Sequence, residues 1–123
     1  MTSSDVQAVV ERELATWRPP QVQPGTTLGV PWSAERYAPE VERLREALVT
    51  PYEQRFSLSE TDDPKRQRIQ GEAVYWVVAA TADMYLWYDE SAHEFGVAVR
   101  GSGDSLPLSI GLRGDIVGSF CAW

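Results

Sequence analysis

Hydrophobic and polar residues form their clearest pattern in the stretch 71–100, GEAVYWVVAATADMYLWYDESAHEFGVAVR. This stretch holds two of the five tryptophans and three of the five tyrosines. Short polar segments separate its apolar runs, which is typical of consecutive β-strands joined by turns. The pattern predicts strands over 73–80, 84–89 and 94–100. Because the first run is apolar nearly throughout, we expect it to be a central strand, buried on both faces with Trp76 in the core.

Further strands are predicted on both sides of this stretch. Residues 52–59 alternate between larger side chains and short polar or charged ones, as expected for a strand with one wet face. Residues 106–112 alternate in the same way after a glycine-rich turn. The apolar segment 116–123 is expected to close the sheet as a last strand, with Cys121 in the core.

Two amphipathic helices are predicted before the strands. One helical face is formed by Val6, Val9, Val10, Leu14 and Trp17, and a second by Tyr37, Val41, Leu44 and Leu48. Pro19 and Pro20 end the first helix, since the residue before a proline avoids the α region. The segment 18–32 holds four prolines and is expected to be an ordered loop.

These elements together predict one α+β domain over residues 1–123, because helices followed by a run of strands are typical of that class. We expect the two N-terminal helices to pack on one face of a mostly antiparallel meander sheet of five to six strands. The length of 123 residues agrees with a single domain that has its own core.

The net charge of −7 narrows the classes of partner. In residues 72–123, seven acids face only Arg100 and Arg113. Because an acidic surface repels phosphates, we expect no nucleic-acid partner and favour a basic protein. Three features of the sequence predict a cytoplasmic protein without disulfides or membrane spans. The chain has one cysteine, its first residues do not show the basic and apolar pattern of a leader, and it contains no long apolar run.

Catalytic and metal-binding motifs do not stand out in the sequence. His93, the only histidine, falls in a predicted turn, and no nucleophile motif accompanies it. Asp89 and Glu90 are adjacent on a strand and so point to opposite faces, which makes them a poor acid–base pair. One histidine and one cysteine far apart do not predict a zinc site. We therefore expect a protein that is not an enzyme and holds no metal or other cofactor.

The predicted binding residues lie around the hairpin 84–99. If helices cover one sheet face, the other face shows aromatic side chains beside carboxylates, a composition enriched at interaction sites. A second small core, closed by the proline-rich loop or by a second copy of the chain, is the alternative for these aromatics. The predicted partner-binding residues are Tyr85, Trp87, Asp89, Glu90, His93 and Glu94.

The helical segment VVERELATWRPP and the strands AVYWVVAA and MYLWYDESAHEFGVAVR resemble the helix–Pro–Pro opening and aromatic strands of the SUKH superfamily. These are small immunity proteins that bacteria pair with secreted toxins. The resemblance implies a compact acidic protein that neutralises a toxin, here a basic toxin domain, by direct contact. Two alternatives remain open. The first is a small-molecule-binding or enzymatic domain with a pocket between sheet and helices, lined by Trp76, Tyr85, Trp87 and His93. The second is a structural subunit that forms a homodimer.

Overall fold

The computed structural model describes residues 1–18, 34–59, 69–101 and 105–121, so the predicted loop at 18–32 lies almost entirely outside the described residues. The elements in chain order are α1 (Ser3–Thr16), α2 (Ala34–Ala47), β1 (Leu48–Ser59), β2 (Ile69–Ala80), β3 (Met84–Asp89), β4 (Glu94–Val99), β5 (Leu108–Gly114) and α3 (Ile116–Cys121). The α+β class is confirmed, and the sheet is mostly antiparallel.

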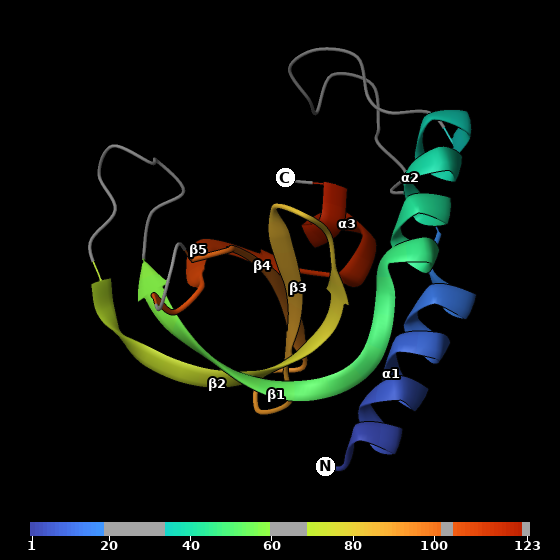
Figure 1. Cartoon of the computed structure of the whole chain (residues 1–123). Helices are drawn as coiled ribbons and strands as arrows, with labels where there is room; N and C mark the ends of the chain where they lie inside the picture. The colour runs from blue at the N-terminus through green and yellow to red at the C-terminus, as the bar shows by residue number, and fades with distance from the viewer. Residues whose placement is uncertain (19–33, 60–68, 102–104, 122–123) are drawn as a thin grey trace.

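The strands close into a barrel in the order β1–β2–β3–β4–β5 (Figure 1). Neighbours along the chain pair antiparallel, whereas β5 returns to β1 in parallel through two residue pairs, Ser57 with Leu108 and Leu58 with Ser109. β1 and β2 contain 12 residues each and curve around one side of the barrel. Shifts in their register, as between Leu48 and Tyr52, provide local irregularities at which such paired strands bend.

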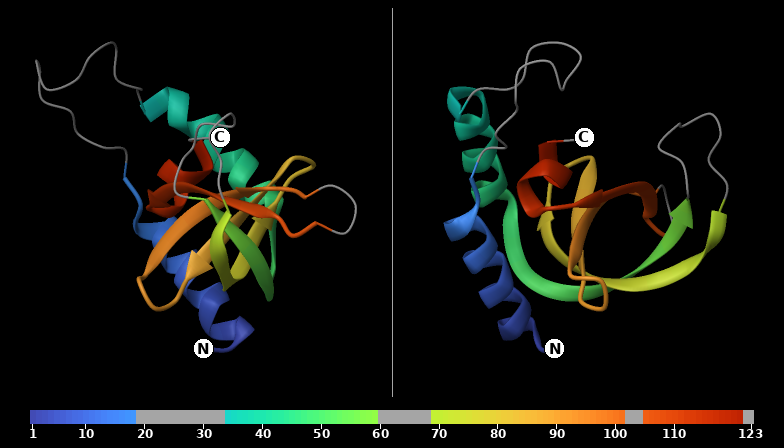
Figure 2. Two further views of the ribbon diagram at one scale, coloured as in Figure 1. Left: turned by 90° about the vertical axis from the view of Figure 1, so that its left-hand side faces the viewer. Right: turned by 180° about the vertical axis from the view of Figure 1, so that it is seen from behind.

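Three predictions about the architecture were wrong. The sheet is closed instead of open, and residues 116–121 form the helix α3 instead of a closing strand. The described residues therefore contain three helices, where the prediction had two N-terminal helices covering one sheet face. The side chains of Ile116, Val117 and Phe120 are buried at spacings that suit one helical face. α3 contacts β4, β5, α1 and α2, so the helices form a layer along one side of the barrel (Figures 1 and 2).

Two apolar clusters lie on opposite faces of the sheet. The larger one joins the helices to the outward face and includes Trp76, which is 8% exposed, as predicted from its apolar strand. The smaller one lies on the inward face and consists of Phe56, Val77, Trp87 and Ala98, with Tyr75 and Tyr85 packed against it. The curvature of the sheet itself thus provides the second small core that the aromatic residues require.

α1 is fixed in position by its start and by one buried face. The Thr2 hydroxyl accepts a hydrogen bond from the Asp5 backbone N–H at 3.2 Å, and the Asp5 carboxylate accepts one from the Thr2 N–H at 2.9 Å. This capping box satisfies two amide groups that the first turn leaves without partners. Val6, Val10 and Leu14 are buried beneath the helix. Within the described part of the chain, no helix combines the length and apolar character needed to cross a membrane.

Candidate functional site

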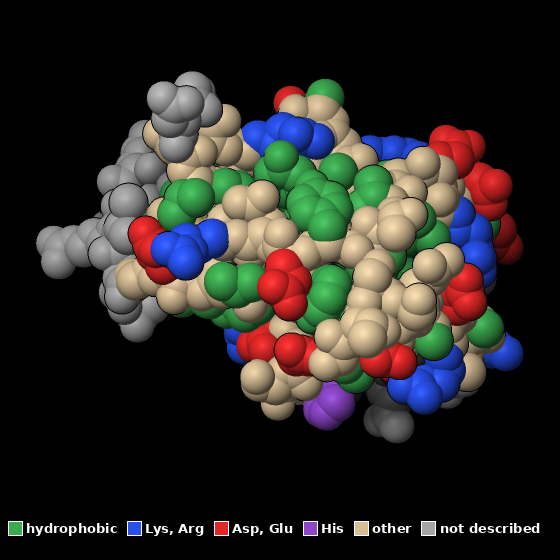
Figure 3. All heavy atoms as spheres, turned by 60° about the horizontal axis from the view of Figure 1, so that its bottom comes forward, with side chains coloured by type: hydrophobic (Ala, Val, Ile, Leu, Met, Phe, Trp, Pro, Cys, Tyr) green, Lys and Arg blue, Asp and Glu red, His purple; other side chains and the backbone are tan. Residues whose placement is uncertain are grey.

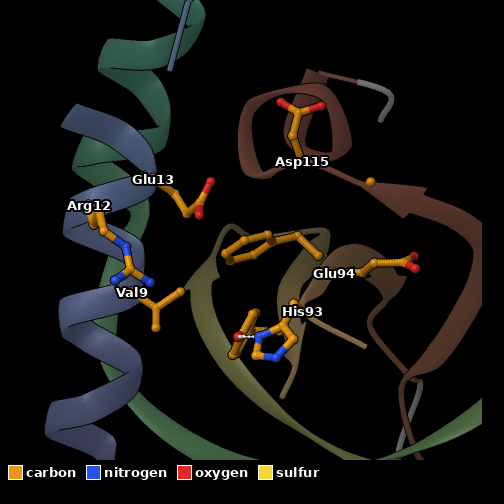
Figure 4. A pocket seen from close by; sticks show the side chains of 9 residues that line it. Val9, Arg12, Glu13, His93, Glu94 and Asp115 are labelled. Atoms are coloured by element: carbon orange, nitrogen blue, oxygen red, sulfur yellow. Dashed lines mark hydrogen bonds between the residues drawn. The ribbon is translucent and has the colours of Figure 1, made fainter. Parts of the chain in front are cut away.

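A cleft of about 280 Å³ lies where α1 faces the β3–β4 hairpin and the segment that leads into α3 (Figure 4). Its polar wall includes Arg12 and Glu13 from α1, His93 and Glu94 from the hairpin, and Asp115. In Figure 4 the carboxylate of Glu13 points from α1 toward the hollow, whereas the Asp115 carboxylate turns toward the start of α3 and that of Glu94 extends away from α1. Three carboxylates and one arginine give the cleft an excess of negative charge.

The hairpin turn places His93 at the rim of the cleft. The Asp89 carboxylate accepts a hydrogen bond from the Ser91 backbone N–H at 3.0 Å, a side-chain turn that reverses the chain after β3. His93 then adopts a φ of 55°, in the left-handed region that few residues other than glycine occupy. The sequence signal for this turn was local, and the structure confirms strand β3 at the predicted bounds, 84–89.

Tyr88 forms a polar point in the otherwise apolar floor of the cleft. Its side chain is buried, and its hydroxyl lies 3.0 Å from Nδ1 of His93 in a shared hydrogen bond. Burial raises the pKa of the Tyr88 phenol, and the carboxylates of Glu13 and Glu90 raise it further. The phenol is therefore protonated at neutral pH and can donate its hydrogen to the imidazole nitrogen.

Asp115 is held rigidly by two hydrogen bonds that use the same carboxylate oxygen. Oδ2 accepts from the backbone N–H of Gly118 at 2.9 Å, which caps α3, and from Nε1 of Trp17 at 3.0 Å. A Cβ at Gly118 would lie 2.5 Å from Oδ1 of Asp115, so the missing side chain allows this close approach. Asp115 thus ties the end of α1 to the start of α3 and closes one wall of the cleft.

Arg113 neutralises part of the hairpin on the inward side of the barrel. Its Nη2 donates to the Asp89 carboxylate and to the Tyr75 hydroxyl, both at 3.0 Å, while Nη1 lies 4.0 Å from Glu94. The guanidinium also lies 5.0 Å from the centroid of the Trp87 ring. Asp89 is therefore occupied by an ion pair, and Glu94, which pairs with Asp89 in the β3–β4 register, has its carboxylate on the same side, toward Arg113.

The six predicted binding residues do not form one surface. His93 and Glu94 line the cleft, and Glu90 lies beside it in the turn, where its carboxylate is 3.2 Å from the N-terminal amine. Tyr85 is half-buried on the inward face, and Trp87 is 1% exposed there. Trp87 is thus a core residue that a partner cannot touch in this conformation. Of the four residues expected to line a pocket between sheet and helices, only His93 does so.

Sequence reasoning missed Glu13, Tyr88 and Asp115. Helical spacing assigns Glu13 only to the polar side of α1, and alternation in β3 assigns Tyr88 only to one sheet face. Asp115 directly precedes the apolar segment 116–123 and belongs to no catalytic or metal-binding motif. No local pattern connects residues 13, 88 and 115, because only the packing of α1 and α3 on the barrel brings them together.

The comparison with protein-family models found no match, and the comparisons with curated proteins and with solved structures likewise found none.

The chemistry available in the cleft is recognition of a positive group. Carboxylates are acceptors with several lone-pair sites, and they bind guanidinium and ammonium groups through charge-assisted hydrogen bonds. Among the described residues, no group of three or more histidine, cysteine, aspartate or glutamate side chains has an arrangement that could hold a metal ion. The carboxylates that line the cleft suit an organic cation such as a guanidinium or an ammonium group.

Proposed function

We propose that the protein is a non-enzymatic binding protein that neutralises a bacterial toxin by direct contact, as immunity proteins do. The observation that carries this proposal is the cleft whose lining includes Glu13, Glu94 and Asp115 beside His93, with the Glu13 carboxylate directed into it. A lysine or arginine of a basic toxin domain would enter this hollow. A cytoplasmic location in the bacterium that makes the toxin belongs to the same proposal.

Charge supports this function at long range as well as at contact. The chain carries a net charge of −7, which attracts a basic partner and raises its association rate. At contact, a guanidinium would displace water from the half-buried carboxylates of Glu13 and Glu94. The charge-assisted hydrogen bonds that it forms would compensate for the water that is lost. Neither carboxylate makes a close ion pair among the described residues, since the shortest such distance is the 4.0 Å between Glu94 and Arg113.

The proposed contact residues differ in role. Glu90 and His93 lie at the exposed rim, where charges mainly affect the association rate and its salt dependence. The Glu94 side chain is as exposed as that of Glu90, 42%, and would also act mainly on the association rate, whereas the half-buried Glu13 would affect the dissociation rate. Tyr85 and Trp87 lie on the inward face of the barrel and are left out of this interface.

The test begins with the genes beside the one that encodes this protein, among which the proposal expects a gene for a secreted toxin with a basic domain. Co-expression of both proteins should restore growth that the toxin alone arrests, and the purified pair should bind directly. The double substitution Glu13→Gln with Glu94→Gln should weaken binding by about tenfold or more, since loss of close charge pairs commonly costs 2 kcal/mol or more. It should also reduce the dependence of the association rate on salt.

A matched control removes the same charge from another surface. Glu42→Gln with Glu46→Gln changes two exposed carboxylates on α2, away from the cleft. This control should change the affinity by no more than about twofold, through long-range charge alone. An acidic partner, or equal losses from both double variants, would contradict the proposed docking site.

A second candidate function is supported by the hydrogen bond between Tyr88 and His93. A histidine that shares a proton with a buried phenol beside three carboxylates could bind a small basic ligand or take part in acid–base chemistry. Calorimetric titration with N-acetyl-arginine amide, compared with its neutral citrulline analogue, separates the two functions. Sub-millimolar binding of the arginine compound alone would favour a small-molecule site.

A further inference from the structure

Arg100 lies at the opposite end of β4 from His93 and has a fixed side chain. Its Nε donates to the Thr81 carbonyl oxygen at 2.7 Å, and its Nη1 donates to the Tyr85 hydroxyl at 2.9 Å. The centre of the guanidinium lies 4.3 Å from the centroid of the Tyr85 ring, a cation–π contact. Two hydrogen bonds and one ring contact therefore hold this exposed side chain in a single orientation.

The charge of Arg100 is not neutralised within the described part of the chain. No carboxylate lies within ion-pair distance of it there, in contrast to Arg113, whose Nη2 is 3.0 Å from Asp89. A guanidinium has five N–H donors, and the two hydrogen bonds named above use two of them. The three remaining donors include both on Nη2, so one edge of the fork is available to an external acceptor.

Two tyrosines add hydroxyl donors and an apolar wall beside this edge. The Tyr85 hydroxyl accepts from Arg100 and so keeps its own hydrogen to donate. Figure 3 shows hydrophobic side chains exposed among charged ones on the lower side of the molecule, and Tyr52 of β1 is 42% exposed. Tyr52 pairs with Val77 of β2 and Tyr85 pairs with Ala80 of the same strand, so the two tyrosines border the same end of β2. Burial raises the pKa of Tyr52, the Tyr85 phenol raises it further, and Arg100 acts in the opposite direction.

We propose that Arg100, Tyr85 and Tyr52 form a binding site for a carboxylate group attached to an aromatic or apolar moiety. The planar fork of arginine matches the two oxygens of a carboxylate, and the Tyr85 hydroxyl can donate to one of them. A single cation on a protein of net charge −7 favours a singly charged group over a phosphate. The exposed ring of Tyr52 would cover the apolar part of the ligand.

This site is independent of the acidic cleft. His93 precedes β4 and Arg100 follows it, so the two sites lie at opposite ends of a six-residue strand, a distance of roughly 20 Å at 3.3 Å per residue. They also prefer opposite charges. Either site can therefore be correct when the other is wrong.

The experiment follows the ¹⁵N-labelled protein by NMR, including the Nε–H signals of its arginines, during titration with benzoate. We expect saturable shifts at Arg100 Nε–H and at the backbone amides of Tyr85 and Arg100, with a Kd of the order of 1–10 mM, typical of a fragment this small. Benzamide, which has the same shape without the charge, should produce no saturable shift. Arg113 serves as the internal control, because Asp89 already occupies its guanidinium.

Variants test the geometry of the site. Arg100→Lys keeps the charge but loses the fork, and we expect it to weaken benzoate binding at least about fivefold. Tyr85→Phe removes the hydroxyl that would donate to the carboxylate and keeps the ring under Arg100, so it remains informative if Arg100→Lys disturbs the strand end. We expect Tyr85→Phe to weaken binding about threefold, the loss of one modest hydrogen bond.

Three results would overturn the proposal. The first is no saturable shift at Arg100 up to about 50 mM benzoate, a concentration severalfold above the expected Kd. The others are equal shifts with benzamide and an equal response at Arg113. An acetylated Phe-Glu amide, compared with Phe-Gln amide, identifies the source of the carboxylate. Tighter binding of the glutamate peptide than of benzoate supports the proposal with a protein side chain as ligand, and tighter binding of benzoate supports it with a free aromatic acid as ligand.

Discussion

Replacement of Gly96 by alanine tests how the inward face of the barrel is packed. Gly96 lies opposite Trp87 in the β3–β4 register, and a Cβ at this position would lie 2.6 Å from Cε2 and Cη2 of the indole and still closer to Cζ2. Tyr75 stacks on that ring with a centroid distance of 4.2 Å. The ring therefore cannot shift without disturbing this stack.

The expected loss of stability follows from the size of the overlap. Carbon atoms in contact are normally about 3.5–4.0 Å apart, so the indole or the strand must move by roughly 1 Å. Overpacking of this kind costs about 1–3 kcal/mol. Removal of a strand glycine returns about 0.5–1 kcal/mol, because the unfolded chain loses freedom. We expect a net destabilisation of about 2 kcal/mol, or roughly 8 °C in Tm for a chain of this length.

Thermal and urea unfolding, followed by circular dichroism, would measure this change. The matched control is the same glycine replacement in a Trp87→Leu background, where the indole is gone and alanine should be tolerated. A double-mutant cycle should then give a coupling free energy of about 1 kcal/mol or more. If Gly96→Ala leaves the parent Tm unchanged, or destabilises both backgrounds equally, the close packing of Trp87 on Gly96 is wrong.

Two further predictions concern the outward core and the start of α1. Trp76→Ala should destabilise by about 3–5 kcal/mol, because the side chain is 8% exposed in the large cluster, and an unchanged denaturation midpoint would place it outside the core. Hydrogen bonds from the backbone and hydroxyl of Thr2 lower the pKa of Asp5. The contribution of Asp5 to stability is therefore fully present at pH values above the ordinary pKa of 3.8, and it is lost as the pH falls through the lower pKa of the folded state. Asp5→Asn should therefore be less stable than the parent near neutral pH, with a difference that closes below about pH 4 in melts at a series of pH values; a difference that stays constant with pH would contradict the capping role.

Local sequence patterns predicted the elements whose signal is complete within a few residues. β3 has the predicted bounds because turn-forming residues border a run of six strand formers, and β4 ends within one residue of its prediction. Trp76 is buried as expected because its strand is apolar on both faces. α1 follows its hydrophobic spacing, with Val6, Val10 and Leu14 buried.

The tertiary structure alone decided the closure of the sheet and the identity of the last element. Two parallel residue pairs join β5 to β1 across about fifty residues of chain, a long-range pairing that leaves no periodic signal. Residues 116–121 are too short an apolar run for periodicity to distinguish a strand from a helix. Closure then placed Trp87 inside the barrel, whereas an open sheet would have left it on a surface.

The residues of the candidate sites also fall into two groups, those that the sequence indicates and those that only the tertiary structure brings together. His93 and Glu94 could be selected from the sequence because a polar turn beside aromatic strands is a local feature. Glu13 and Asp115 could not be selected, since no pattern in their own segments indicates a site and only the fold brings them to the same cleft. Arg100 likewise gains its two acceptors, the Thr81 carbonyl and the Tyr85 hydroxyl, only because β3 and β4 pair in the register that sets Tyr85 opposite Ala98.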